Sequence, residues 1–336
     1  MSKLKLGILD QSIVTQGKTA IDAVEETIAT VKLGEKLGFS RFWVSEHHNS
    51  SFIAGSTPEV LMVKLADETK HIRIGSGGIM LPNHSALKVA ENFRMLETLF
   101  PGRIDLGIGR APGGDRITAA LLNPSNDFSE QSYLQQLEYL QHFFGDTAAT
   151  KYGPILAVPQ SPTIPSQWIL SSSGGSSKIA AQFGVGLAIA RFINGFAQPD
   201  IVELYRKNFE ASAQFSKPHA LLSISVICGE TEEDARQMRK FLDYVLVQFE
   251  QGKFDNFGDE AFIQKYQFSL AEQERIHRNR GRVISGTKDE VKEKLLTLAN
   301  EFDVDEVIVA TMANNWQKRR RSFELLAEAF ELKPRA

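Results

Sequence analysis

Short apolar runs alternate along the chain with longer stretches in which apolar residues recur every three or four positions. A short apolar run bounded by turn residues is typical of a buried strand, and the wider spacing is typical of an amphipathic helix. The pattern predicts strands at about residues 4–9, 42–44, 72–81, 104–109, 168–170, 187–190, 221–227 and 307–309. It predicts helices at about 20–37, from 57, at 85–99, at 129–144, after 176, at 199–212, from 231, from 287 and at 318–330.

Several of the predicted helices have recognisable end signals. Gly38 follows the first helix, at the position where glycine tolerates a left-handed backbone. Thr57 and Pro58 have the pattern of a helix start, with a capping hydroxyl followed by proline in the first turn. Thr287 and Glu290 have the spacing of a capping box. These signals support the helices independently of the hydrophobic period.

The alternation predicts one α/β domain over residues 1–336. Parallel strands need crossover connections, so strands that alternate with helices predict a parallel sheet. Eight such units in this length fit a closed (β/α)8 TIM barrel better than the alternative, a doubly wound sheet with an inserted domain. The rhythm breaks at about 111–165 and 251–283. We interpret both regions as excursions on loops, because neither has enough periodic elements to bury its own core.

Composition and charge exclude several classes of protein. Apolar residues make up 42% of the chain, and 38 Lys plus Arg against 41 Asp plus Glu give a formal charge of −3. Because no basic stripe is present either, nucleic acid is not an expected partner. The single cysteine, Cys228, excludes an intramolecular disulfide, and its sequence context favours packing over reactivity. No apolar run reaches the length of a membrane span and no export signal follows Met1, so we expect a cytoplasmic protein without a membrane partner.

In a barrel of this type the chemistry lies at the carboxyl ends of the strands. This rule brings together residues that are far apart in the sequence and are rich in glycine and hydroxyl groups. The candidates are Asp10, Gln11, Glu46, His47, His48, Gly77, Gly78, Asn83, His84, Gly109, Arg110, residues 171–177, Arg191 and Thr311.

The segment Ser171–Ser177 joins a predicted strand to a predicted helix and reads SSSGGSS. Free backbone N–H groups and small hydroxyls at the start of a helix can bind an anion. Arg110, at the end of the preceding predicted strand, could donate two hydrogen bonds to the same phosphate. The alternative is a turn that only caps the helix. We favour a phosphate site because of Arg110.

Glu46, His47 and His48 are residue types that can bind Zn²⁺ or Fe²⁺. However, consecutive strand residues point to opposite faces, so the two histidines are not expected to share one ion. We favour one histidine in a structural role and one acting as a base. A metal-dependent hydrolase that uses these three residues is the alternative.

Glycines interrupt two of the predicted strands, at 75–78 and at 107–109. Glycine inside a strand indicates a bulge or a ligand that lies against the backbone. The pattern therefore allows a flat ring system at the mouth of the barrel. Tight packing of a neighbouring helix would explain the same glycines, and the spacing leaves both interpretations open.

Four long motifs together resemble the luciferase-like flavin-dependent monooxygenases, the barrel family of bacterial luciferase, and above all their single-polypeptide bacterial members. The resemblance runs nearly end to end and implies the TIM barrel fold. The motifs are FWVSEHHN at 42–49, GSGGIMLPNHS at 75–85, PGRIDLGIGRAPG at 101–113 and WILSSS at 168–173, followed by AAQFG at 180–184 and DEV at 305–307.

The resemblance implies FMN at the barrel mouth, with Gly78 and Gly109 against the isoalloxazine ring and Glu46 beneath it. It also implies a cis peptide between Gly77 and Gly78. His47 matches the catalytic histidine of the family and would act as a general base. The cofactor-binding residues implied in this way are Glu46, Gly77, Gly78, Gly109, Arg110, Ser173, Gly174, Gly175, Ser176 and Ser177.

This chain departs from the light-emitting enzyme at two informative positions. Gly109 stands where luciferase has its active-site cysteine, and Arg191 stands where luciferase has an apolar aromatic residue. An added cation favours a polar or anionic substrate over a long aldehyde, with Arg191 and His48 in the substrate pocket. Many relatives form homodimers through the helices that match about 57–69 and 85–99 here. An apolar face is compatible with a dimer or with the barrel core, and consists of Leu61, Leu65, Leu87, Val89 and Phe93.

The function expected from these observations is an FMN-dependent two-component monooxygenase or oxidoreductase. It would receive reduced flavin from a separate flavin reductase, because no nicotinamide-binding fingerprint is present, and would use O₂ on a small organic substrate. A deazaflavin-dependent oxidoreductase on the same barrel is one alternative. A non-catalytic flavin-binding protein is another, although the presence of His47 argues against it.

Overall fold

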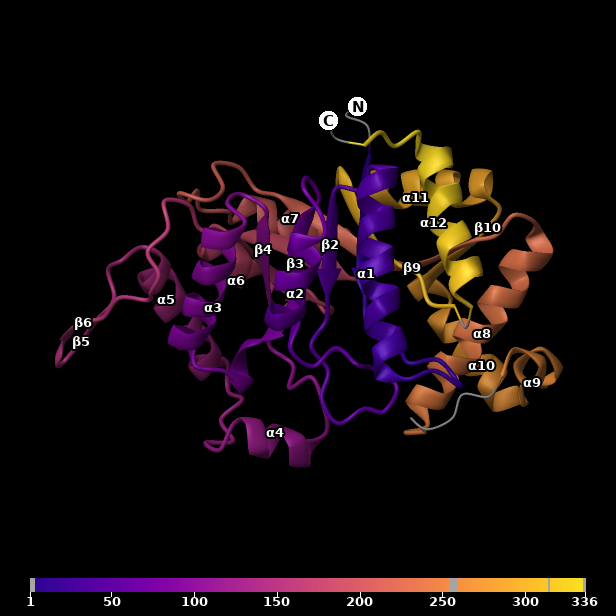
Figure 1. Cartoon of the computed structure of the whole chain (residues 1–336), viewed down its shortest axis with the longest axis horizontal. Helices are drawn as coiled ribbons and strands as arrows, with labels where there is room; N and C mark the ends of the chain where they lie inside the picture. The colour runs from indigo at the N-terminus through magenta and orange to yellow at the C-terminus, as the bar shows by residue number, and fades with distance from the viewer. Residues whose placement is uncertain (1–3, 254–258, 314, 335–336) are drawn as a thin grey trace.

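The computed structural model describes residues 4–253, 259–313 and 315–334, and there eight parallel strands close into a barrel (Figure 1). The expectation that no export signal follows Met1 concerns a residue outside this part. Residues 254–258 of the second excursion also lie outside it. The strands neighbour one another in the order β1–β2–β3–β4–β7–β8–β9–β11, and β11 pairs with β1. That pairing closes the sheet, so the TIM barrel is confirmed and the doubly wound sheet is excluded. The barrel strands are β1 Lys5–Asp10, β2 Arg41–Val44, β3 Arg73–Met80, β4 Ile104–Gly109, β7 Ser166–Ser171, β8 Gly186–Ala190, β9 Ala220–Cys228 and β11 Glu306–Ala310.

Helices surround the barrel, and all the predicted ones are present. The helix expected at 199–212 is shorter than predicted, because the polar segment after Lys207 forms a loop. Within the described part, none of the helices is long and apolar enough to cross a membrane. The helices are α1 Ala20–Leu37, α2 Pro58–Asp67, α3 Ala86–Leu99, α4 Arg116–Leu122, α5 Glu130–Phe144, α6 Ser177–Gln182, α7 Asp200–Lys207, α8 Glu232–Glu250, α9 Glu260–Lys265, α10 Leu270–Asn279, α11 Lys288–Glu301 and α12 Trp316–Phe330, with 3₁₀ turns η1 at Leu81–Asn83 and η2 at Arg280–Arg282.

Two of the three predicted helix-end signals are confirmed. Gly38 ends α1 with a φ of 91°, the left-handed backbone expected of it. At α11 the Glu290 carboxylate accepts a hydrogen bond from the Thr287 N–H (2.8 Å). The expected Thr57 cap is wrong. Its ψ of 76° departs from the extended geometry that would aim the hydroxyl into the first turn, and α2 begins at Pro58 without a side-chain cap.

Both excursions contain more structure than the sequence predicted. The first holds α4 and a short antiparallel hairpin, β5 Ala149–Thr150 and β6 Gly153–Pro154, besides the expected α5. The second holds α9 and α10 and leads into β10 Val283–Gly286. β10 pairs with the last residues of β9, which follow the residues of β9 that pair with β8. The hairpin, α4, α9 and β10 are too short for a periodic pattern to reveal them, and α10, although ten residues long, buries only Glu272 and Asn279 and so presents no apolar face. In Figure 1, α4 and α10 lie at the end of the barrel opposite the two chain termini.

The apolar core consists mainly of one layer between the strands and the helices and a smaller cluster inside the barrel, around Trp43 and Trp168. Leu65, Val89 and Phe93 are buried in the outer layer. Leu61 and Leu87 pack against that layer as well, so the face suggested for a dimer belongs to the core. Different side chains of α2 and α3 are exposed: Val60, Val63, Met95 and Leu99.

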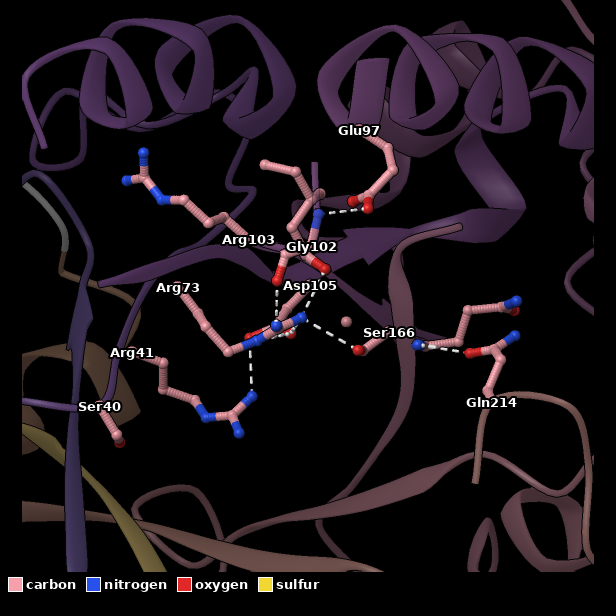
Figure 2. A network of polar contacts seen from close by, with 12 residues as sticks. Ser40, Arg41, Arg73, Glu97, Gly102, Arg103, Asp105, Ser166 and Gln214 are labelled. Atoms are coloured by element: carbon pink, nitrogen blue, oxygen red, sulfur yellow. Dashed lines mark hydrogen bonds and ion pairs between the residues drawn. The ribbon is translucent and has the colours of Figure 1, made fainter. Parts of the chain in front are cut away.

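Buried ion pairs fill the base of the barrel, at the amino ends of the strands (Figure 2). Asp105 accepts from Arg41 (2.7 Å), Arg73 (2.7 Å) and the Trp43 indole (3.0 Å). Arg41 also contacts Glu306 at 2.7 Å. Burial raises the pKa of the Glu306 carboxyl, but Arg41 outweighs that effect and holds the pKa well below its usual range. We call this set the base network; it leaves the opposite end as the mouth.

Cys228 lies at the end of β9 and is fully enclosed. Burial raises the pKa of its thiol to about 12. A thiol that stays protonated is a poor nucleophile. The predicted packing role of Cys228 is therefore consistent with its environment.

Candidate active site at the barrel mouth

The carboxyl ends of β2, β3, β4 and β7 follow one another around the mouth, because each of these strands pairs with the next. The segments Glu46–His48, Gly77–His84, Arg110 and Ser171–Ser177 therefore leave the barrel along one arc of the rim. The sequence-based expectation that distant strand ends meet is fulfilled by this order. What each side chain contacts decides its part in the site.

Glu46 is a buried hydrogen-bonding hub beneath the rim. His48 Nε2 lies 2.8 Å from Glu46 Oε1, and His84 Nε2 lies 2.9 and 3.0 Å from the two carboxylate oxygens. The Met80 N–H donates to Oε2 at 2.8 Å, and the Asn83 amide is 3.4 Å from Oε1. The carboxylate is thus engaged with protein groups, and its position beneath a flavin ring stays a prediction.

The hub also sets the charge of its members. Burial raises the pKa of the Glu46 carboxyl, but hydrogen bonds from His84 and His48 outweigh it, and the pKa lies below its usual range. Burial likewise lowers the pKa of His84, and the bonds to Glu46 outweigh that effect and raise it. The favoured state is therefore an ionised Glu46 beside a protonated His84.

His47 makes its side-chain contact away from this hub, although Glu46–His48 lie after the end of β2 and strand alternation does not apply to them. Its ring Nε2 lies 3.4 Å from Gln11 Nε2. The backbone N–H of His47 donates to the Gly55 carbonyl at 2.9 Å. Burial and the neighbouring His48 lower the pKa of His47. At neutral pH the imidazole is neutral and can accept a proton. The cavity beside it has a volume of about 660 Å³ and is lined by His47, Asn49, Ser50, Ser51, Ile53, Ala54 and Ser56.

Close packing against backbone leaves no room for a side chain at Gly78, whereas Gly109 lies against the movable end of the Met80 side chain. The peptide between Gly77 and Gly78 is cis, as the resemblance implied. A Cβ on Gly78 would lie 2.7 Å from the Gly107 carbonyl oxygen, and one on Gly109 would lie 2.5 Å from the Met80 methyl group. The close neighbours belong to adjacent strands and not to the packed helix that the sequence left open. Contact of Gly77, Gly78 or Gly109 with a flavin ring stays a prediction.

The serine-rich turn divides into an inner and an outer part. Ser171 accepts from the Gly174 N–H (3.1 Å), and the buried Ser177 hydroxyl donates to the Gly174 carbonyl (2.7 Å). Gly174 has a φ of 85°, which glycine allows. On the outer part Ser173 is exposed, the Ser176 hydroxyl makes no capping bond, and the missing side chain of Gly175 faces open space.

Arg110 follows β4 and is half exposed at the rim. Its Nη1 lies 2.7 Å from a carboxylate oxygen of Glu130, at the start of α5. Because both partners are largely exposed, the pair is weak and an incoming anion can replace Glu130. β4 pairs directly with β7, so Arg110 and Ser171 leave neighbouring strands.

Arg191 and His48, expected in the substrate pocket, are engaged by the protein itself. The Arg191 guanidinium donates to the carbonyls of Gly281 (3.2 Å) and Ala197 (2.8 Å) and lies over the Phe302 ring. It thereby ties the loop after β8 to η2. His48 is held by Glu46. Substrate contact by either side chain stays a prediction.

The strand-end rule selected Gln11, Asn83 and His84, but sequence alone assigned them no role. Their partners lie on other strand ends, 36 to 38 positions away for Gln11 with His47, Asn83 with Glu46 and His84 with Glu46. No pattern in the sequence indicated that Glu130 contacts Arg110. Among the described residues, no group of three His, Cys, Asp or Glu side chains is arranged to hold a metal ion.

Comparison with known proteins places this arrangement in a family. Residues 4–305 match the luciferase-like monooxygenase family. N-acetyl-S-alkylcysteine monooxygenase of Bacillus subtilis is 34% identical over 97% of this chain and 98% of its own length. A luciferase-like monooxygenase of Escherichia coli is 32% identical over 98% of this chain and 97% of its own. The crystal structure of apo-MsnO8 superposes with a TM-score of 0.87 at 32% identity, covering 99% of this chain and 100% of the other. The chain therefore belongs to the luciferase-like monooxygenase family.

Proposed function

We propose that the protein is the oxygenase component of a two-component, FMN-dependent monooxygenase. It would take reduced FMN from a separate flavin reductase and use O₂ on a small organic substrate. The observation that carries the proposal is the position of His47, a neutral base that faces a cavity at the barrel mouth. Members of the family use FMN or F420. The relatives of about a third identity that are named monooxygenases favour FMN here.

The rim residues fit a phosphorylated cofactor. The half-exposed Arg110 guanidinium provides paired N–H donors, and the outer part of the serine turn provides Ser173 and Ser176 hydroxyls beside open space at Gly175. Arg110, Ser173 and Ser176 would therefore hold the phosphate, with Gly174, fixed by Ser171 and Ser177, and Gly175 as the backbone between them. Reduced flavin, when bound, supplies the electrons that activate O₂.

The side chains of this chain would then position and move protons. His47 would take a proton from the substrate at its Nε2, whose hydrogen-bond partner within the described part of the chain is the Gln11 amide at 3.4 Å. Glu46 would hold the rim segments together from below. The closed base would exclude water from that side, so the reacting atoms would meet solvent only at the mouth.

The test is a titration of the protein with reduced and oxidised FMN beside F420, followed by measurement of O₂ consumption with a panel of sulfur and carbonyl compounds. We expect tighter binding of FMN than of F420 and substrate-dependent O₂ consumption with reduced FMN. Preference for F420 would contradict the flavin assignment. Tight FMN binding without turnover of any kind would favour a flavin-binding protein without catalysis.

In the same titration, Arg110→Ala is expected to weaken FMN binding about 10- to 150-fold, since a charge-assisted hydrogen bond to phosphate contributes about 1.5–3 kcal/mol. Glu130→Gln removes the competing anion and should leave binding equal or a few-fold tighter. Arg116→Ala is the matched control, because Arg116 is another exposed arginine near the mouth, on α4. Equal loss in the Arg110 and Arg116 variants would assign the effect to net charge alone.

We further propose a homodimer formed through α2 and α3. The support is the exposed apolar set on these two helices, Val60, Val63, Met95 and Leu99. Val60→Asp combined with Met95→Asp is expected to convert a dimer to a monomer in sedimentation velocity, because charges would be buried at the interface. Ile117→Asp, at an equally exposed position on α4, should leave the dimer intact. A monomeric wild-type protein at micromolar concentration would exclude this interface.

A further inference from the structure

The Glu46 carboxylate joins three segments of the rim. His48 belongs to the segment after β2, the Met80 N–H to the end of β3, and His84 to the residues after η1. The segment after β4 is attached as well, because the His48 N–H donates to the Gly113 carbonyl at 3.0 Å. A side chain that holds Glu46 in place therefore acts on the rim segments after β2, β3 and β4.

In the segment after β2, His47 lies between Glu46 and His48, the two residues that this hub connects. Glu46 and His48 are bonded to each other at 2.8 Å, and the His47 N–H is fixed to the Gly55 carbonyl at 2.9 Å. The backbone of His47 is thus held on both sides and at its own amide. The Glu46–His48 contact and the Gly55 bond therefore fix the backbone position from which the imidazole reaches the cavity.

His84 is the group that contacts both oxygens of Glu46, at 2.9 and 3.0 Å. We propose that His84 is a positioning residue for His47 and that it acts through the Glu46 carboxylate. Only the expected effect on kcat and on the pH profile rests on the proposed function. The structural part of the proposal, the coupling of His84 to His47, can be measured in the protein alone.

The charges around His84 determine in which direction loss of the His84 charge would move the pKa of His47. The titratable groups that face it are Glu46 and His48 from the rim and Glu59 from α2, whereas the Asn83 amide is an uncharged member of the hub. The pKa of His84 is raised and that of His47 is lowered, so His84 is protonated where His47 titrates. Removing the His84 charge leaves Glu46 less compensated, and the more negative surroundings favour protonation of His47.

The experiment is a ¹⁵N NMR titration of the His47 side chain in the wild-type protein and in His84→Gln, with His71→Gln as control. Glutamine keeps an N–H donor near the position of Nε2 but removes the charge. His71 is exposed at the other end of the molecule, before β3. We expect the titration midpoint of His47 to rise by about 0.5 unit in His84→Gln and to stay unchanged in the control.

Kinetics provide the second readout. In His84→Gln the low-pH limb of kcat/KM for the proposed reaction should move upward with the His47 midpoint. His84→Ala, which also removes the donor, should lower kcat about tenfold further while FMN binding is retained. An unchanged His47 midpoint and an unchanged pH profile in a folded His84→Gln protein would overturn the proposal.

The wild-type protein offers a test that needs no substitution. If His84 is coupled to His47, the His47 resonance should show a second, smaller inflection at the pH where His84 loses its proton. A single inflection would count against the coupling even if the variants failed to fold. Absence of flavin-dependent turnover would refute the proposed function and leave both NMR results interpretable.

Discussion

Asp105→Asn is expected to lower the free energy of unfolding by about 3–5 kcal/mol. Asp105 is completely buried and balances Arg41 and Arg73 together with Glu306. The substitution keeps the size of the side chain but leaves two guanidinium groups with one carboxylate in the base network. The midpoint of urea unfolding, followed by circular dichroism and tryptophan fluorescence, measures the loss.

Lys88→Ala is the matched control for this prediction, because it breaks a longer and exposed pair between Lys88 and Glu91 (3.5 Å). A pair of that kind contributes at most about 0.5 kcal/mol. If Asp105→Asn shifted the midpoint no more than the control, the base network would not be a major source of stability. Glu306 adds a pH dependence: its lowered pKa means that its contribution is present above about 4.5, its usual value, and is lost as the pH falls below it.

His47→Ala is expected to reduce substrate-dependent O₂ consumption about 10²- to 10⁴-fold, the usual contribution of a general base. FMN binding should persist, because His47 is not among the residues proposed to hold the phosphate. The wild-type rate should fall as the pH drops through the lowered pKa of His47, since the protonated imidazole cannot accept a proton. Product formation under saturating reduced FMN, measured between pH 5 and 9, checks both statements.

His71→Ala serves as the control for His47→Ala, since it removes an imidazole far from the mouth. Turnover equal to the wild type in His47→Ala would refute the role of His47 as a base. Loss of FMN binding together with turnover would instead assign His47 to cofactor binding. The two outcomes are separated by the same flavin titration that tests Arg110.

The barrel could be predicted from the sequence because its strands and helices follow simple periods. Each strand is a short apolar run, and α1 carries its own stop signal at Gly38. β10 was missed because only Val283 of its four residues is buried, which leaves no apolar pattern to detect. The helix α4 was missed for a similar reason: seven residues with Ile117 and Leu121 exposed do not show an amphipathic face.

The candidate site was predictable only as far as the strand-end rule reaches. The rule placed Glu46, His47 and His84 at one end of the barrel, and the expectation that the two neighbouring histidines have different surroundings agrees with their separate contacts, His48 with Glu46 and His47 with Gln11. It could not show that one carboxylate would collect donors from three segments, because that depends on side-chain geometry between strands. Arg191 illustrates the same limit. Its position after β8 suggested a ligand, but the carbonyls that bind it come from Ala197 and the distant Gly281.

The base network also has a consequence for how ligands reach the site. Arg41, Asp105 and Glu306 fill the amino end of the barrel, so we expect a small molecule to reach the carboxyl ends of the strands through the mouth. A flavin delivered by a reductase would then enter through the mouth. An organic substrate would have to enter through the same opening. Whichever arrives second must fit over the first, which makes the order of loading a property of the barrel's architecture.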